Sequence, residues 1–441
     1  MLLITSNIDF LFIFDLILSL VHLRCPVQEG SESGSDEQPD KTFGKKSNGT
    51  KRAAAALSVG IGNYSDPQDI PGLSHYLEHM LFMGSKKFPD ENEYDAFLNR
   101  HNGSSNAYTE EETTTFFFDC SPEALKPMLD RFSQFFISPL LKSEALEREV
   151  LAVDNEFADV NQNDSCRLAQ ARAIRAKPDH PAAKFSWGNK KSLFDIPVSR
   201  DVDIQGELLH HFECNYKAER MTLVVISGEE ITILESWISE LFSPVPKGSG
   251  LPLKFDAYGF PFEEEFTMSI IPSVCDEHKI GILFQLPSSL QKEYLKKAED
   301  YVSHLVGHEG NGSLFDLLKK REWATELCAG TIEQTSAAWL FEVSITLTEL
   351  GMNASPGCGL AVVEAVFEYL SFLKSSEPVE WIWREMGRIS QMKWLHVEEE
   401  DPAEYVSQIS VDMQIFPMEH VLCWSYMHEI YDTNLVCLDD L

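Results

Sequence analysis

The stretch from Gly72 to Leu81 constrains this chain more than any other, because it holds His75, Glu78 and His79 in the order His-x-x-Glu-His. Histidines four residues apart lie on one face of an α-helix, about one turn from each other. Such a face can bring two imidazole nitrogens to a single zinc ion. With a proline before it and a glycine after it, the motif predicts a helix over residues 71–83.

A hydrolytic zinc site needs a third protein ligand and a position left for water. Glu156 is the best downstream candidate, because Glu149 and Glu156 share one face of a helix predicted over residues 143–163. Apolar neighbours indicate that both carboxylates point inward, where they need a cation or hydrogen-bond donors. Glu149 is then suited to orient a histidine N–H, and Glu78 to take the proton of a water that zinc activates. These residues predict metal-assisted amide hydrolysis with a single Zn²⁺ in the chain.

The other elements predict an α+β fold of two tandem homologous α/β units, each a mostly antiparallel sheet with helices packed on one face. The predicted strands cover residues 53–60, 221–227, 280–286 and 339–347, and residues 106–119 are predicted to form a hairpin or paired strands. The predicted helices cover 90–100, 122–137, 203–213, 231–242, a stretch from 292, and 358–375. The predicted domain ranges are 1–52 (apolar N-terminal segment and acidic flexible linker), 53–256 (zinc-binding) and 257–441 (second unit without metal).

The net charge and the number of cysteines limit which partners and which cellular compartment are expected. The net charge of −34 argues against nucleic acid or an anionic membrane as a partner, and it favours basic peptides. Nine dispersed cysteines are typical of reduced thiols, so a cytoplasmic location is expected. The apolar residues 1–23 lack a cationic start and contain Asp9 and Asp15, yet they leave a signal or membrane anchor open.

Four stretches carry a resemblance to a known family: residues 72–85 (GLSHYLEHMLFMGS), 88–92 (FPDEN), 104–109 (SSNAYT) and 147–156 (EREVLAVDNE). On these stretches the chain resembles the pitrilysin–insulysin family of zinc metallopeptidases, most closely its nardilysin-like branch. The family spacing places the third zinc ligand at Glu156. The resemblance implies an endopeptidase that cleaves oligopeptides at basic, often dibasic, sites.

The resemblance also implies two substrate-binding elements. Asn106, Ala107 and Tyr108 are expected on an edge strand, onto which a peptide adds as a further strand. The turn that contains Gly310 and Gly312 resembles the family's second site, which anchors the N-terminal end of a substrate. Ordinary strand and turn structure is the alternative for both segments.

Members of this branch are longer, and their second half closes a chamber over the zinc. The sequence therefore predicts an N-terminal half, truncated relative to the family, with a complete metal site and an incomplete chamber. No clear match to the family's first strand is found in residues 1–27. The rival hypothesis is a zinc-loaded fragment that binds peptides, a C-terminal half or a second copy with little catalysis. A mitochondrial processing subunit is disfavoured by the acidic N-terminal region.

Overall fold

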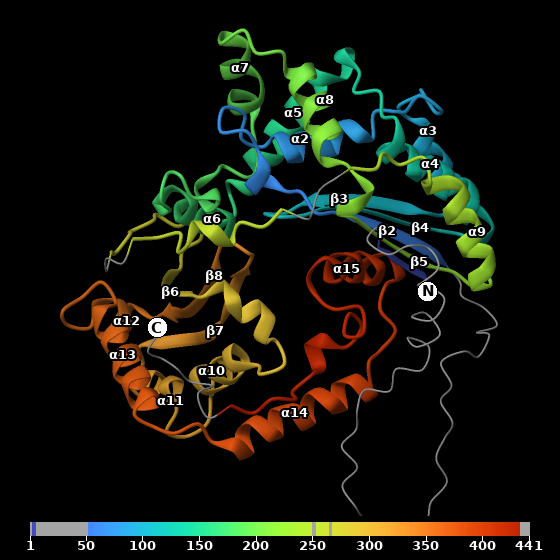
Figure 1. Cartoon of the computed structure of the whole chain (residues 1–441). Helices are drawn as coiled ribbons and strands as arrows, with labels where there is room; N and C mark the ends of the chain where they lie inside the picture. The colour runs from blue at the N-terminus through green and yellow to red at the C-terminus, as the bar shows by residue number, and fades with distance from the viewer. Residues whose placement is uncertain (1, 6–51, 249–252, 264–266, 433–441) are drawn as a thin grey trace, which may run out of the picture. The chain divides into compact units, whose positions relative to one another are not determined.

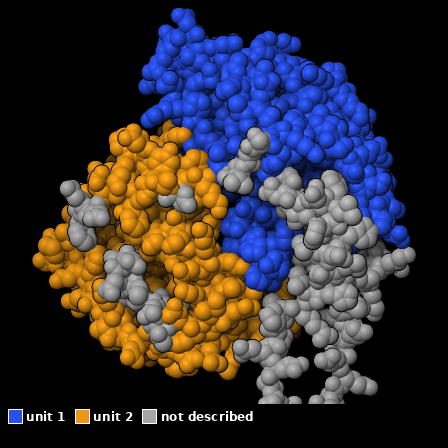
Figure 2. Space-filling model, viewed as in Figure 1, with its two compact units in different colours: residues 1–155, 186–253, 398–423 blue, residues 156–185, 254–397, 424–441 orange. Residues whose placement is uncertain are grey.

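The computed structural model describes residues 2–5, 52–248, 253–263 and 267–432, and these divide into two compact units (Figure 1, Figure 2). Unit 1 comprises residues 1–155, 186–253 and 398–423, and unit 2 comprises residues 156–185, 254–397 and 424–441. The units thus combine separate stretches of chain, whereas the predicted domain ranges are continuous and stay predictions. Apart from residues 2–5 and 52, the predicted N-terminal segment and linker lie outside the described residues.

Unit 1 is built on a five-stranded antiparallel sheet in the order β1-β5-β2-β4-β3. Its strands are β1 (Leu2–Thr5), β2 (Ala53–Val59), β3 (Ser104–Thr109), β4 (Thr114–Cys120) and β5 (Met221–Ile226). Strand β1 pairs with β5 and supplies a first strand that the sequence pattern did not reveal. Every residue of the central strand β2, AAAALSV, is buried, as is typical of a strand covered on both faces.

One face of this sheet is covered by helices that surround the motif. The helices that begin in unit 1 are α2 (Leu73–Leu81), α3 (Glu93–Arg100), α4 (Leu125–Ile137), α5 (Ser143–Val160), α7 (Ile196–Ser199), α8 (Ile204–Asn215), α9 (Ile231–Phe242) and α15 (Pro402–Ile415). In α4, Met128, Phe132 and Phe136 are fully buried, as their spacing of four residues predicts. Leu73 and Leu77 of α2 join the same core, which fixes the motif helix against the sheet.

The opposite face of the unit 1 sheet is covered by α15, although this helix is far away in sequence (Figure 1). Ala54 and Ala56 of β2 pack against Val406 and Ile409 of α15. The Gln414 side chain donates hydrogen bonds to backbone carbonyls of unit 1 at 3.1–3.2 Å. Helices therefore cover both faces of this sheet, whereas the prediction had helices on one face only.

Unit 2 contains a three-stranded antiparallel sheet in the order β6-β8-β7. Its strands and helices are β6 (His278–Leu286), β7 (Ala324–Gln334), β8 (Trp339–Leu347), α6 (Asp164–Arg175), α10 (Ala298–Val306), α11 (Leu314–Lys320), α12 (Glu349–Asn353), α13 (Leu360–Lys374) and α14 (Glu380–Leu395). Its core joins Val343 and Ile345 of β8 to Val306, Leu318 and Val366 on three of these helices. The predicted α+β class is confirmed. None of the described helices combines the length and the apolar composition needed to cross a membrane.

Candidate metal centre

Helices α2 and α5 bring together the three residues predicted as metal ligands. A ligand atom from each of His75, His79 and Glu156 lies within 4.8 Å of the other two, and no other such group of three or more His, Cys, Asp or Glu occurs in the described part of the chain. The two imidazole rings are 5.0 Å apart between centroids and 75° from coplanar. His75 is buried, and His79 and Glu156 are partly buried. Two imidazoles and one carboxylate form the donor set of a hydrolytic zinc site with one position open.

A loop that sequence reasoning did not single out orients His75. The carbonyl oxygen of Trp187 lies 2.6 Å from Nδ1 of His75. Because a carbonyl can only accept, Nδ1 carries the proton and Nε2 carries the lone pair that a metal requires. The loop reaches α2 through two glycines with left-handed backbone, Gly72 (φ 91°) and Gly188 (φ 74°). A Cβ atom at Gly72 would lie 2.2 Å from the Cα of Gly188, so the approach depends on glycine.

Glu149 on α5, which was predicted to orient a histidine N–H, lies near His79. Nδ1 of His79 is 3.8 Å from Oε2 of Glu149, an ion-pair distance rather than a tight hydrogen bond. The pKa of Glu149 is held below its ordinary value, first by its interaction with His79 and then by Arg148, while burial opposes the shift. Glu149 is therefore an ionised acceptor at neutral pH, suited to keeping the proton of His79 on Nδ1.

The carboxylate of Glu78 is buried and held by the edge strand β3. The hydroxyl of Thr109 donates to Oε2 of Glu78 at 2.7 Å. Thr109 also lies 3.3 Å from the hydroxyl of Thr114, which donates to the carbonyl of Ile61. This pairing restricts the orientation of the Glu78 carboxylate. Sequence reasoning missed Thr109, although it closes the SSNAYT stretch and could have been found from it.

The predicted substrate strand is an edge strand. Asn106, Ala107 and Tyr108 pair with Phe117, Phe116 and Thr115 of β4, and β3 ends the strand order of the described sheet. Its outer edge therefore offers backbone groups to an added strand. The Tyr108 hydroxyl is 2.9 Å from that of Ser407 on α15, and burial raises its pKa. The segment thus has the geometry for strand addition next to Glu78.

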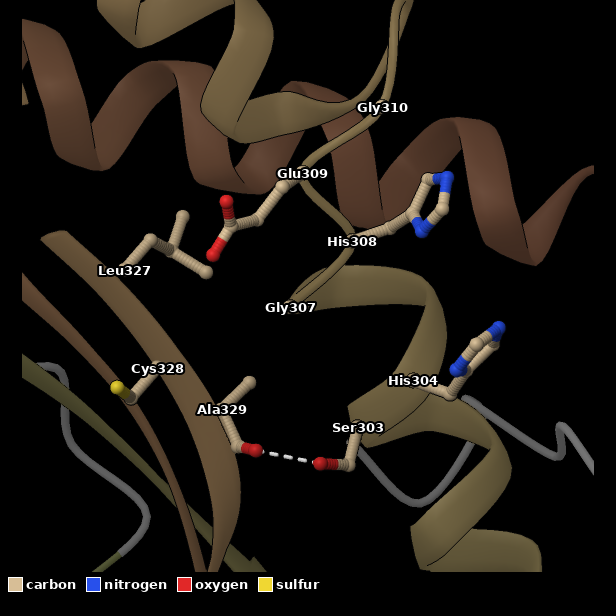
Figure 3. A pocket seen from close by; sticks show the side chains of 9 residues that line it. All are labelled: Ser303, His304, Gly307, His308, Glu309, Gly310, Leu327, Cys328 and Ala329. Carbon is tan, nitrogen blue, oxygen red and sulfur yellow. Dashed lines mark hydrogen bonds between the residues drawn. The ribbon is translucent and has the colours of Figure 1, made fainter. Parts of the chain in front are cut away.

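The predicted glycine-rich site in unit 2 borders a cavity of about 540 Å³ (Figure 3). The cavity is lined by Ser303, His304, Gly307, His308, Glu309, Gly310, Leu327, Cys328 and Ala329. Gly310 belongs to this wall, but Gly312 does not, and the Gly312 amide donates to Asp316 at 2.8 Å. Figure 3 shows the Glu309 carboxylate turned toward Leu327 and the two histidine rings turned away from it.

Comparison with known proteins places these features in a family. Residues 42–184 match the family model "Insulinase (Peptidase family M16)", and residues 204–386 match "Peptidase M16 inactive domain". A nardilysin-like protein of Arabidopsis thaliana is 43% identical over 391 residues, 88% of this chain and 38% of that protein. Nardilysin of Homo sapiens is 39% identical over 394 residues, 88% of this chain and 34% of that protein.

A solved structure shares the fold. The crystal structure of pitrilysin aligns with a TM-score of 0.77 at 26% identity, covering 88% of this chain and 41% of that one. This chain therefore spans well under half the length of these three relatives.

Proposed function

Because the chain belongs to the insulinase family of peptidases (peptidase family M16), we propose that it is a zinc-dependent endopeptidase, or the zinc-binding part of one. The proposed substrates are oligopeptides cleaved at basic or dibasic sites. The observation that carries this proposal is the meeting of His75, His79 and Glu156 within 4.8 Å. The buried Glu78 on the same helix supplies a general base.

Each residue of the centre has a distinct role in this proposal. His75 and His79 would hold Zn²⁺ through Nε2, and Glu156 would hold it through its carboxylate. A zinc ion held there would supply a Lewis acid and would lower the pKa of its bound water. Glu78, oriented by Thr109, accepts the proton of the attacking water and returns it to the leaving amine.

The substrate follows from the edge strand and from charge. An extended peptide adds to β3 beside Asn106, Ala107 and Tyr108 through backbone hydrogen bonds. A net charge of −34 attracts basic peptides and repels nucleic acid. The turn that contains Gly310, in the wall of the unit 2 cavity, and Gly312, outside that wall, is the proposed second site for the N-terminal end of the peptide. The cytoplasm is the proposed compartment, and cell fractionation distinguishes it from secretion or membrane anchoring by residues 1–23.

A second candidate function concerns the 441-residue chain by itself. This chain spans 34–38% of the nardilysin relatives described above. In this alternative, the zinc-loaded chain would bind peptides, a C-terminal half or a second copy of itself, and it would cleave peptides only slowly. The two candidates agree on the metal centre and differ in turnover.

The test measures zinc and cleavage separately. We expect about one zinc per purified chain, lost in His75→Ala and Glu156→Ala, while Glu78→Gln retains zinc and abolishes cleavage of a dibasic peptide. Exposed neighbours supply the controls: His210→Ala and Glu147→Gln should change neither quantity. Zinc retained in His75→Ala or Glu156→Ala would refute the ligand assignment.

Cleavage is assayed with and without an added C-terminal half from a nardilysin-like relative. Turnover that requires the added half favours the binding fragment as the function of the isolated chain. Cleavage by the Glu78→Gln variant would place the general base elsewhere.

A further inference from the structure

We propose that a hydrogen-bond chain, which runs from the buried Asp66, Ser74 and His211 to the partly buried Asn215 and Arg220, is a positioning network that sets the metal affinity of α2. None of these residues is among the predicted ligands, the base or the substrate contacts. The proposal rests on the proposed metal centre, because it concerns the helix that carries His75 and His79.

The network begins at the first turn of α2, where the helix lacks a local cap. Gly72 is the N-cap residue, and it has no side chain that could accept the orphan amides of the first turn. Asp66 takes this role from the preceding loop. Its Oδ2 accepts the Gly72 amide at 2.7 Å, and its Oδ1 accepts the Ser74 amide at 2.8 Å. A carboxylate at a helix N-terminus is also favoured by the helix dipole.

The direction of each further hydrogen bond follows from the atoms involved. The single hydroxyl proton of Ser74 goes to Asp66 Oδ1 at 2.6 Å or to the Gly62 carbonyl at 3.1 Å, and both are acceptors. Ser74 must therefore accept from His211, whose Nε2 lies 3.0 Å away. This assigns the proton of neutral His211 to Nε2 and leaves Nδ1 as an acceptor.

The remaining links are consistent with that assignment. The amide nitrogen of Asn215 lies 3.3 Å from His211 Nδ1 and donates to it. The amide oxygen of Asn215 accepts from the Arg220 guanidinium at 2.8 Å. A one-way series of donors thus runs from a cation to a carboxylate. It connects α2 to α8 and to the residue that precedes β5.

Burial makes the links among Asp66, Ser74 and His211 costly to break, whereas Asn215 and Arg220 are partly buried. Asp66, Ser74 and His211 are 2%, 1% and 5% exposed. A partner removed at such depth leaves a donor or acceptor without water to replace it. The network therefore holds α2 in one rotation about its axis.

That rotation matters to the metal because Ser74 immediately precedes His75. A turn or slide of α2 moves His75 and His79 together relative to Glu156 on α5. Zinc sites tolerate only small errors in ligand distance, and groups that orient ligands typically change metal affinity about 10- to 100-fold when removed. Filling of the core alone would not depend on which atom of residue 211 donates.

The experiment compares three substitutions in the full chain. His211→Phe removes the donor, His211→Gln keeps an amide donor near the position of Nε2, and His210→Phe alters the exposed neighbour on the same helix. Zn²⁺ affinity is measured by competition with a chromophoric chelator. Hydrogen exchange is measured over residues 73–81 without metal.

We expect His211→Phe to bind zinc about 10-fold or more weakly and to exchange faster across α2. His211→Gln should recover most of both properties, and His210→Phe should match the wild type. Equal zinc affinity in His211→Phe and His210→Phe overturns the proposal, and so does failure of His211→Gln to recover when it folds normally. If His211→Phe does not fold, Asp66→Asn replaces it with the same expectations.

The exchange measurement separates this proposal from the proposed function. A wild-type chain that binds no zinc refutes the proposed function and the effect on affinity together. Faster hydrogen exchange of His211→Phe that is confined to α2 would still show that the network caps this helix. Unchanged exchange would refute any structural role of the network.

Discussion

Replacement of Gly72 by alanine tests whether the glycine contact builds the metal centre. The new Cβ would lie 2.2 Å from Gly188 Cα, about 1.3 Å short of an ordinary carbon–carbon contact of about 3.5 Å. Both sides of this clash are backbone, so no side-chain rotation relieves it. Alanine at φ 91° adds about 1–3 kcal/mol of backbone strain, and the shift breaks the Gly72–Asp66 hydrogen bond, worth about 1 kcal/mol or more. We expect a total loss of about 3–5 kcal/mol.

Gly84→Ala is the matched control, because Gly84 lies in the same unit with φ 94° and a closest Cβ contact of 3.0 Å. It should lose mainly the strain, about 1–3 kcal/mol, because the backbone of Phe88 and Pro89 at 3.0–3.3 Å needs to shift much less than Gly188 would at 2.2 Å. Urea unfolding measures both losses, and metal analysis measures zinc. Gly72→Ala should also lose zinc, because the displaced loop takes the Trp187 carbonyl away from His75. Equal stability losses with zinc retained in both variants would refute this reasoning.

Three further changes test other contacts. Thr109→Val removes the hydrogen bond to Glu78, worth about 1.5–3 kcal/mol, so peptide turnover should fall about 10- to 150-fold with zinc content unchanged; unchanged turnover contradicts this. Burial raises the pKa of Asp119, but Arg52 and other donors bring it below its ordinary value, so its stabilisation is present above about pH 4 and lost as pH falls further. Asp119→Asn should flatten that acid loss in urea titrations, and an unchanged pH profile would count against it. Val406→Asp, at a fully buried position of α15, should cost more than about 3 kcal/mol of unfolding free energy, and a loss below about 1 kcal/mol would show that α15 contributes little.

Elements with strong local periodicity were predictable from the sequence. Helix α9 (Ile231–Phe242) and strand β8 (Trp339–Leu347) have the predicted bounds, because a one-sided apolar stripe and a regular alternation are visible in the residues themselves. Strand β7 was not predicted, since its exposed and buried residues do not alternate regularly. Helix α15 was missed because the sheet face that buries Val406 is formed by strands distant in sequence.

The candidate site also contains residues that the sequence pattern reveals and contacts that it does not reveal. His75, Glu78 and His79 can be recognised in the sequence by their helical spacing. In the structure, Glu156 lies beside the two histidines. The group that orients His75 is a backbone carbonyl, and a carbonyl has no signature in the sequence. The support of Glu78 by Thr109 depends on how a strand lies beside a helix. Such pairings require the tertiary fold.

The packing of α15 on β2 has a consequence for synthesis on the ribosome. Val59 and Pro402 are 343 positions apart, so at 5–20 residues per second β2 emerges about 20–70 s before the helix that covers its second face. Ala54 and Ala56 lack their α15 partners throughout that interval, and Val224 joins the uncovered apolar surface once β5 has emerged. Nascent unit 1 is therefore a natural client for chaperones that bind hydrophobic surface, and any stop of translation before α15 leaves an aggregation-prone sheet.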